Sequence, residues 1–148
     1  MFVNQDNSKS RPSTQYSEVI REIAQEGVCP FCSDNLRRYH KNPLVEKEFW
    51  WVTDNMYPYS PTKHHRLIIY KQHISHGSEI GKEAWVELQK ILQEEISQRG
   101  IAGGAFVMRF GDTHYTGGTV SHLHAHILQS DPESSEYDLK KGLLMRIG

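Results

Sequence analysis

The chain has 148 residues, which fits one compact domain with a substantial core. Its formal net charge is −1 with histidine neutral, so we expect neither nucleic acid nor an anionic membrane surface as a partner. No apolar run approaches the roughly 20 residues that span a bilayer, and the first residues lack the hydrophobic stretch of a signal peptide. A cytoplasmic location is therefore expected.

The beginning of the chain is predicted to lie outside the folded domain. Residues 1–13 are polar, contain serine, asparagine and proline, and show no hydrophobic period. We expect them to form a flexible tail, followed by a single domain over residues 14–148. Apolar residues then recur at helical spacing between Gln15 and Glu26, and Gly27 follows as a residue suited to end a helix. This pattern predicts an N-terminal helix.

The rest of the chain alternates between strands and one long helix. Apolar and β-branched runs predict strands at Glu48–Thr53, His65–Tyr70, Ala105–Phe110 and Thr119–Leu128. An apolar stripe predicts a helix from about Glu79 to Arg99, with Ser78 as its candidate N-cap. Prolines and an Asp-Asn pair predict a loop over residues 54–64. This order favours an α+β domain in which the long helix covers one face of an antiparallel sheet.

Three histidines, His122, His124 and His126, alternate with apolar residues in the last predicted strand. Because side chains on a strand alternate between its two faces, the three imidazoles are expected to share one face, with the apolar side chains directed into a core. Two kinds of chemistry fit such a row. Three histidines can bind a metal ion, and a neutral imidazole can attack a phosphorus atom while its neighbours donate to phosphoryl oxygens.

The only two cysteines form a C-x-x-C pair, Cys29 and Cys32. In a reducing compartment a structural disulfide is not expected, which leaves a redox dithiol or half of a zinc site. The chain also contains nine histidines, several of them clustered, and this favours zinc.

The segment from His122 to Leu128 resembles the histidine-triad (HIT) pattern, in which three histidines alternate with apolar residues. The preceding residues 117–121 resemble the glycine-rich approach of that family, and the segment from His65 to His73 resembles its His-x-Leu-Val-Ile-Pro-Lys-x-His segment. The resemblance covers roughly residues 28–130. It implies a HIT-like antiparallel sheet of about five strands with a long helix packed on it.

The resemblance also implies a reaction at the α-phosphate of a nucleotide. His124 would be the nucleophile that forms a nucleotidyl-histidine intermediate, and His126 would bind phosphoryl oxygens or the leaving group. His65 matches a further histidine near the leaving group, and Thr119 matches a residue that contacts phosphate. A histidine rather than glutamine at position 126 favours hydrolysis of a nucleoside phosphoramidate or a dinucleoside polyphosphate over transfer.

Zinc-bearing branches of the HIT superfamily combine a C-x-x-C pair with a histidine after the second strand and the first histidine of the triad. The corresponding residues here are Cys29, Cys32, His73 and His122. A Cys₂His₂ set suits a closed, tetrahedral, structural zinc site.

Substrate-binding residues are expected around the triad. The resemblance implies that Asn55, or else Asp54, binds the ribose of a purine nucleotide or nucleotide conjugate, and that the molecule forms homodimers. Gly118 stands where the family usually has glutamine, so a phosphate-contacting amide is missing or is supplied from elsewhere. Arg109 is either a phosphate ligand or a solvated charge on a strand.

Two other functions fit the same residues. One is a nucleotide-binding module with little turnover, which the replacement at Gly118 motivates. The other is a metal-dependent hydrolase that holds one ion between His122, His124 and His126.

Overall fold

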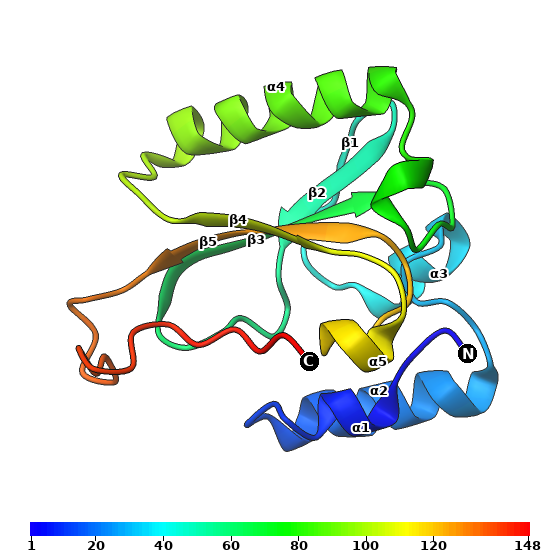
Figure 1. The fold of residues 1–148 in the computed structure, drawn as a ribbon, viewed down its shortest axis with the longest axis horizontal. Helices are drawn as coiled ribbons and strands as arrows, with labels where there is room; N and C mark the ends of the chain where they lie inside the picture. Colours follow the sequence, from blue (N-terminus) through cyan, green and yellow to red (C-terminus); the bar gives the residue numbers. More distant parts are fainter.

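The computed structural model describes residues 1–148 and contains one five-stranded antiparallel sheet (Figure 1). Its strands follow the order β1-β2-β3-β5-β4. Their bounds are Val45–Glu46 for β1, Trp50–Asp54 for β2, Thr62–Tyr70 for β3, Ala105–Arg109 for β4 and His124–Ser130 for β5. The predicted α+β class and the sheet of about five strands are confirmed.

The long helix α4 (Lys82–Arg99) lies across one face of the sheet (Figure 1). The main core fills the layer between them, because the apolar residues of the helix face those of the strands. Its members include Trp50, Val52, Ile68, Leu88, Ile91, Leu123, Ala125 and Ile127. The expected N-cap at Ser78 is wrong. A 3₁₀ turn over Gly77–Glu79 precedes the helix, whose N-cap is Gly81.

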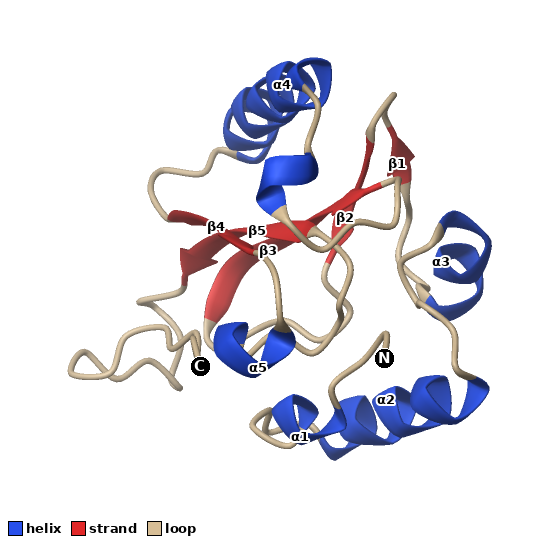
Figure 2. Cartoon of the chain, turned by 45° about the vertical axis from the view of Figure 1, so that its right-hand side comes forward, coloured by secondary structure: helices blue, strands red, loops and turns tan.

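Four shorter helices lie on the opposite side of the sheet (Figures 1 and 2). They are α1 (Gln5–Ser8), α2 (Thr14–Glu26), α3 (Ser33–Tyr39) and α5 (Thr113–Thr116). Helix α2 ends as predicted at Gly27, which has a left-handed conformation with φ +67°. A second apolar cluster joins this helix to other segments through Val3, Ile20, Ile23 and Val120.

The first residues pack against the domain, which differs from the expected flexible tail. Val3 is buried and pairs with Val120 in an isolated antiparallel bridge. The side chain of Asn4 caps α1 by accepting from the backbone N–H groups of Asp6 and Asn7. Sequence periodicity missed this segment because a single bridge and a four-residue helix are too short to show a repeat.

The last strand begins later than predicted. Strand β5 starts at His124 rather than Thr119, so His122 lies in the loop before it. The alternation nevertheless extends through this loop, because Leu123 joins the core with Ala125 and Ile127. None of the helices is both long enough and apolar enough to cross a bilayer.

Candidate functional site

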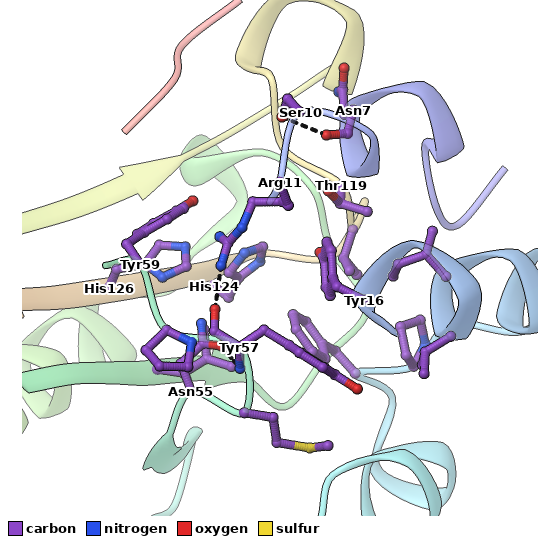
Figure 3. A pocket seen from close by; sticks show the side chains of 18 of the residues that line it. Asn7, Ser10, Arg11, Tyr16, Asn55, Tyr57, Tyr59, Thr119, His124 and His126 are labelled. Carbon is purple, nitrogen blue, oxygen red and sulfur yellow. Dashed lines mark hydrogen bonds between the residues drawn. The ribbon is translucent and has the colours of Figure 1, made fainter. Parts of the chain in front are cut away.

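A cavity of about 510 Å³ lies between the sheet and the N-terminal helices (Figure 3). Strand β5, the loop after β2, helix α2 and the residues before α2 all contribute to its walls. The labelled residues in the close-up are Asn7, Ser10, Arg11, Tyr16, Asn55, Tyr57, Tyr59, Thr119, His124 and His126. The volume falls in the range of small-molecule sites in proteins.

His124 presents one free ring nitrogen to this cavity. Its Nδ1 lies 2.6 Å from the backbone carbonyl oxygen of His122, so Nδ1 carries the proton and donates it to that carbonyl. Nε2 is therefore the unprotonated nitrogen. Burial lowers the pKa of His124 to about 4, and the Phe31 ring packs edge-on at 5.0 Å between centroids. The imidazole is neutral and nucleophilic near pH 7.

A chain of hydrogen bonds fixes the tautomer of His126. The backbone N–H of Tyr59 donates to Nδ1 of His65 at 3.0 Å, so the proton of His65 sits on Nε2. That N–H donates to Nδ1 of His126 at 2.9 Å. The remaining proton of His126 is on Nε2, which is buried without a partner. His126 is thus poised to donate a hydrogen bond to a bound ligand.

The imidazole rings of His65 and His126 are both kept neutral by their surroundings. Burial, with the nearby charges of Arg11 and His124 acting in the same direction, lowers the pKa of His65 to about 3. Burial also holds the pKa of His126 well below its ordinary value, with the neighbouring histidines, Arg109 and Arg11 acting in the same direction.

The four predicted metal ligands converge on one point. The metal-binding atoms of Cys29, Cys32, His73 and His122 all lie within 4.8 Å of one another. Nε2–H of His122 donates to the Tyr70 carbonyl at 2.6 Å, which leaves its Nδ1 free to bind a metal ion.

The distances within this group suit a tetrahedral metal ion. Nδ1 of His122 lies 3.3 Å from Sγ of Cys29, 3.8 Å from Sγ of Cys32 and 3.2 Å from Nδ1 of His73. Ligand atoms around a tetrahedral zinc, with bonds of roughly 2.0 to 2.3 Å, are about 3.3 to 3.8 Å apart. The donor set and its geometry therefore fit a closed metal site, to which His124 and His126 do not belong.

The two candidate ribose ligands point to different places. Asn55 lines the cavity, where its Oδ1 accepts from the backbone N–H of Tyr57 at 2.8 Å and its Nδ2 lies 3.2 Å from Nε2 of His65. Asp54 does not reach the cavity. It forms a 2.9 Å ion pair with buried Arg66, which also binds Glu95 of α4.

The candidate phosphate ligands lie close to the triad. Arg109 lines the cavity, donates to the hydroxyl of Tyr59 at 3.4 Å and also donates to the Arg146 carbonyl. Thr119 lines it as well. Gly118 lies just outside this cavity, and its carbonyl accepts a 2.8 Å hydrogen bond from the side chain of Asn7.

The charged side chains that line the cavity are all positive. No carboxylate side chain lines it, whereas three arginines do, namely Arg11, Arg109 and Arg146. The cavity is also lined by apolar and aromatic side chains, among them Val19 and Phe31. Such a site suits an anion that carries a flat apolar group.

The motifs and their geometry agree with a comparison against protein families. The model of the family "Scavenger mRNA decapping enzyme C-term binding" matches residues 28–142, which is most of the chain. The chain belongs to this family, within the histidine-triad superfamily. A search of curated protein sequences found no significant match.

Solved structures of HIT proteins share this fold. A "Hit Like Protein" is 26% identical, with a TM-score of 0.54, over 65% of this chain and 93% of that one. A HIT family hydrolase from Clostridium thermocellum is 24% identical, with a TM-score of 0.53, over 68% of this chain and 90% of that one. A Zn-bound histidine triad family protein from Mycobacterium smegmatis is 17% identical, with a TM-score of 0.54, over 74% and 79% respectively.

Two cavity residues of this HIT protein were not among the individually predicted site residues. Tyr59 stacks on His65 with ring centroids 4.9 Å apart, and Arg11 lies over Tyr59 with its Cζ 4.0 Å from the ring centroid. Tyr59 lies in a predicted loop, and Arg11 lies in a segment expected to be a tail. Neither residue belongs to a motif or a periodic pattern, so the sequence contained no signal for them.

Proposed function

We propose that this HIT protein is a nucleotide hydrolase that works through a covalent nucleotidyl intermediate on His124. The observation that carries the proposal is the hydrogen bond from Nδ1–H of His124 to the His122 carbonyl. It leaves Nε2 as a nucleophile that faces a cavity without carboxylates. The substrate class is a purine nucleotide conjugate, either a phosphoramidate or a dinucleoside polyphosphate.

In the first step, Nε2 of His124 forms a bond to the α-phosphorus, and the bond between that phosphorus and the leaving group breaks. The electron pair of the broken bond goes to the leaving atom, which takes up a proton from the solvent where it is an amine nitrogen. The proton on Nε2 of His126 forms a hydrogen bond to this atom or to a phosphoryl oxygen, where negative charge develops. The carbonyl of His122 stabilises the positive charge of the substituted imidazole through Nδ1–H.

In the second step, a water oxygen bonds to the phosphorus and the bond to Nε2 of His124 breaks. The electron pair returns to Nε2, and the water releases one proton to the solvent. The products are a nucleoside monophosphate and the leaving group, at the cost of one water molecule. The same neutral His124 is then ready for another cycle.

The metal in this proposal is a structural zinc held by Cys29, Cys32, His73 and His122. Its contribution would be to fix the loop that carries the His122 carbonyl. A homodimer also stays a prediction, which light scattering of the purified protein would test.

The proposal is tested by turnover and by trapping of the intermediate. Diadenosine triphosphate and adenosine 5′-phosphoramidate are supplied to the wild type, to His124→Ala and to His114→Ala, an exposed histidine outside the cavity. Rapid quenching and mass spectrometry should find an adenylyl group on His124 in the wild type and in the His114 control alone. Turnover retained by His124→Ala would overturn the covalent mechanism. Binding without any adenylylation in the wild type would instead support the nucleotide-binding module.

A further inference from the structure

Arg11 extends into the cavity from the first segment of the chain, which precedes the region that matches the family model (Figure 3). Its guanidinium group lies over the ring of Tyr59, and its Cζ is also 5.4 Å from the ring centroid of Tyr16. It faces the row formed by His124 and His126 (Figure 3). A charged side chain is thus placed beside the reacting groups by residues that the family match does not include.

Backbone hydrogen bonds attach this segment to the loop before His122. The N–H of Asn4 donates to the carbonyl of Thr119 at 2.7 Å, and the N–H of Ser121 donates to the carbonyl of Phe2 at 2.8 Å. The side-chain amide of Asn7 donates to the carbonyl of Gly118 at 2.8 Å. Arg11 therefore follows a segment that is fixed to the glycine-rich approach to the triad.

No acidic group neutralises Arg11. It forms no ion pair, and the one hydrogen bond of its side chain is to the carbonyl of Tyr57. Its Nε is buried without a partner, as are Nε of Arg109 and Nε2 of His126, which line the same cavity. These three unpartnered N–H donors belong to residues that line one cavity, a pattern expected where a bound ligand supplies the acceptor. Guanidinium groups match phosphate in charge and geometry.

The position of Arg11 distinguishes it from a residue that contacts the base. Its guanidinium group lies over Tyr59, which stacks on His65, the histidine that the family resemblance places near the leaving group. The apolar wall formed by Val19, Ile23 and Phe31 leaves room for the flat part of a nucleotide instead. Arg11 is thus on the leaving-group side of the α-phosphate in the reaction proposed above.

We propose that Arg11 is a substrate-binding residue for the phosphate next to the α-phosphate, and that it makes the site selective for substrates whose leaving group is itself a phosphate. This inference rests on the proposed function. The cavity is lined by three arginines and no carboxylate, so a neutral leaving group would gain no electrostatic binding energy there. A leaving group that carries an ammonium group would be repelled.

The same residue accounts for the replacement at position 118. A Cβ atom at Gly118 would lie 3.2 Å from Oγ1 of Thr116 and 3.6 Å from Cδ of Arg109, so the loop packs closely there. No side chain at this position donates to phosphate. In its place, Arg11 supplies a guanidinium group. It belongs to the N-terminal segment, in which Asn7 donates to the Gly118 carbonyl.

The test measures binding, so it does not depend on turnover. Dissociation constants for AMP and for the non-hydrolysable α,β-methylene ADP are determined by calorimetry for the wild type and Arg11→Gln. Arg21→Gln, an exposed arginine of α2 outside the cavity, is the matched control. Arg11→Lys keeps the charge without the planar fork. Circular dichroism and thermal unfolding verify that each variant is folded.

Loss of a charge-assisted contact predicts that Arg11→Gln weakens binding of the ADP analogue at least tenfold and of AMP less than threefold. Arg11→Lys should lie between, and Arg21→Gln should match the wild type. Equal weakening of both ligands, or no weakening, overturns the role of Arg11. A selective loss in a protein that never forms adenylyl-His124 would support Arg11 while the hydrolase proposal fails. Adenylylation of His124 without a selective loss of binding in Arg11→Gln would support the hydrolase proposal and overturn the role of Arg11.

Discussion

Nε2 of His65 lies 2.9 Å from Nδ1 of His126, on neighbouring antiparallel strands β3 and β5. Because the backbone of Tyr59 occupies the other nitrogen of His65, this contact has a defined direction, with His65 as the donor. We infer that His65 acts through His126, whose Nε2–H has no partner within the protein.

This direction predicts the effect of removing the donor. His65→Leu leaves Nδ1 of His126 without a donor, so the proton can move to Nδ1 and Nε2 no longer donates. We expect kcat to fall on the order of tenfold to a hundredfold with little change in KM. His65→Gln carries an amide donor and should recover part of the rate. Steady-state kinetics of both variants test this, and equal losses in the two would contradict the assigned direction.

The neighbouring residues Asn55 and Asp54 are predicted to behave differently. Asn55→Ala should raise KM by roughly threefold to tenfold, as expected for one lost hydrogen bond to substrate. Asp54→Ala should leave KM within about twofold and lower the free energy of unfolding by up to about 1 kcal/mol, because Arg66 loses an ion-pair partner. Kinetics together with urea denaturation separate the two effects. A larger KM change in Asp54→Ala would reverse the assignment.

Metal removal is predicted to weaken the fold and to slow the reaction without abolishing it. A zinc site bound at free zinc 1,000 times its dissociation constant adds about 4 kcal/mol to the free energy of unfolding. Cys29→Ser should therefore lower the melting temperature and the zinc content, while His124 still reacts slowly. Metal analysis, thermal unfolding and activity are compared with His76→Ala, an exposed histidine outside the ligand group. Full zinc content in Cys29→Ser would disprove the ligand assignment.

Folding stability should depend on the neutral state of His65. Its pKa is about 3 in the folded protein and near 6.5 in the unfolded chain, so the unfolded state binds the extra proton between these values. Stability is complete above pH 6.5 and is lost as the pH falls toward 3. From pH 7.5 to 5.5 this group should cost about 1.4 kcal/mol.

Urea denaturation at the two pH values tests this dependence. The titratable and charged groups that face His65 are His126, His124, Arg11 and Tyr59, and they remain in His65→Gln. The variant should lose about 1.4 kcal/mol less than the wild type over this interval. A parallel loss in both proteins would show that His65 is not the group responsible.

The sequence by itself determined the parts of this protein that depend on local order. The alternation of His122, His124 and His126 with apolar residues assigned one face to chemistry and the other to the core, since a strand repeats every two residues. The C-x-x-C spacing and the motif at His65–His73 were equally local, and the structure brings their metal ligands together as expected. The order of the elements was sufficient to predict the antiparallel sheet and the helix that covers it.

Only the tertiary structure decided which residues meet across the chain. Asp54 and Asn55 are adjacent in sequence, yet one turns toward Arg66 and the other toward the cavity, and the sequence favoured Asn55 without excluding Asp54. Arg11 is more than a hundred residues from His124, and its segment lacks any period. Its place beside the triad follows from long-range hydrogen bonds and from burial of Val3, which depend on the path of the whole chain.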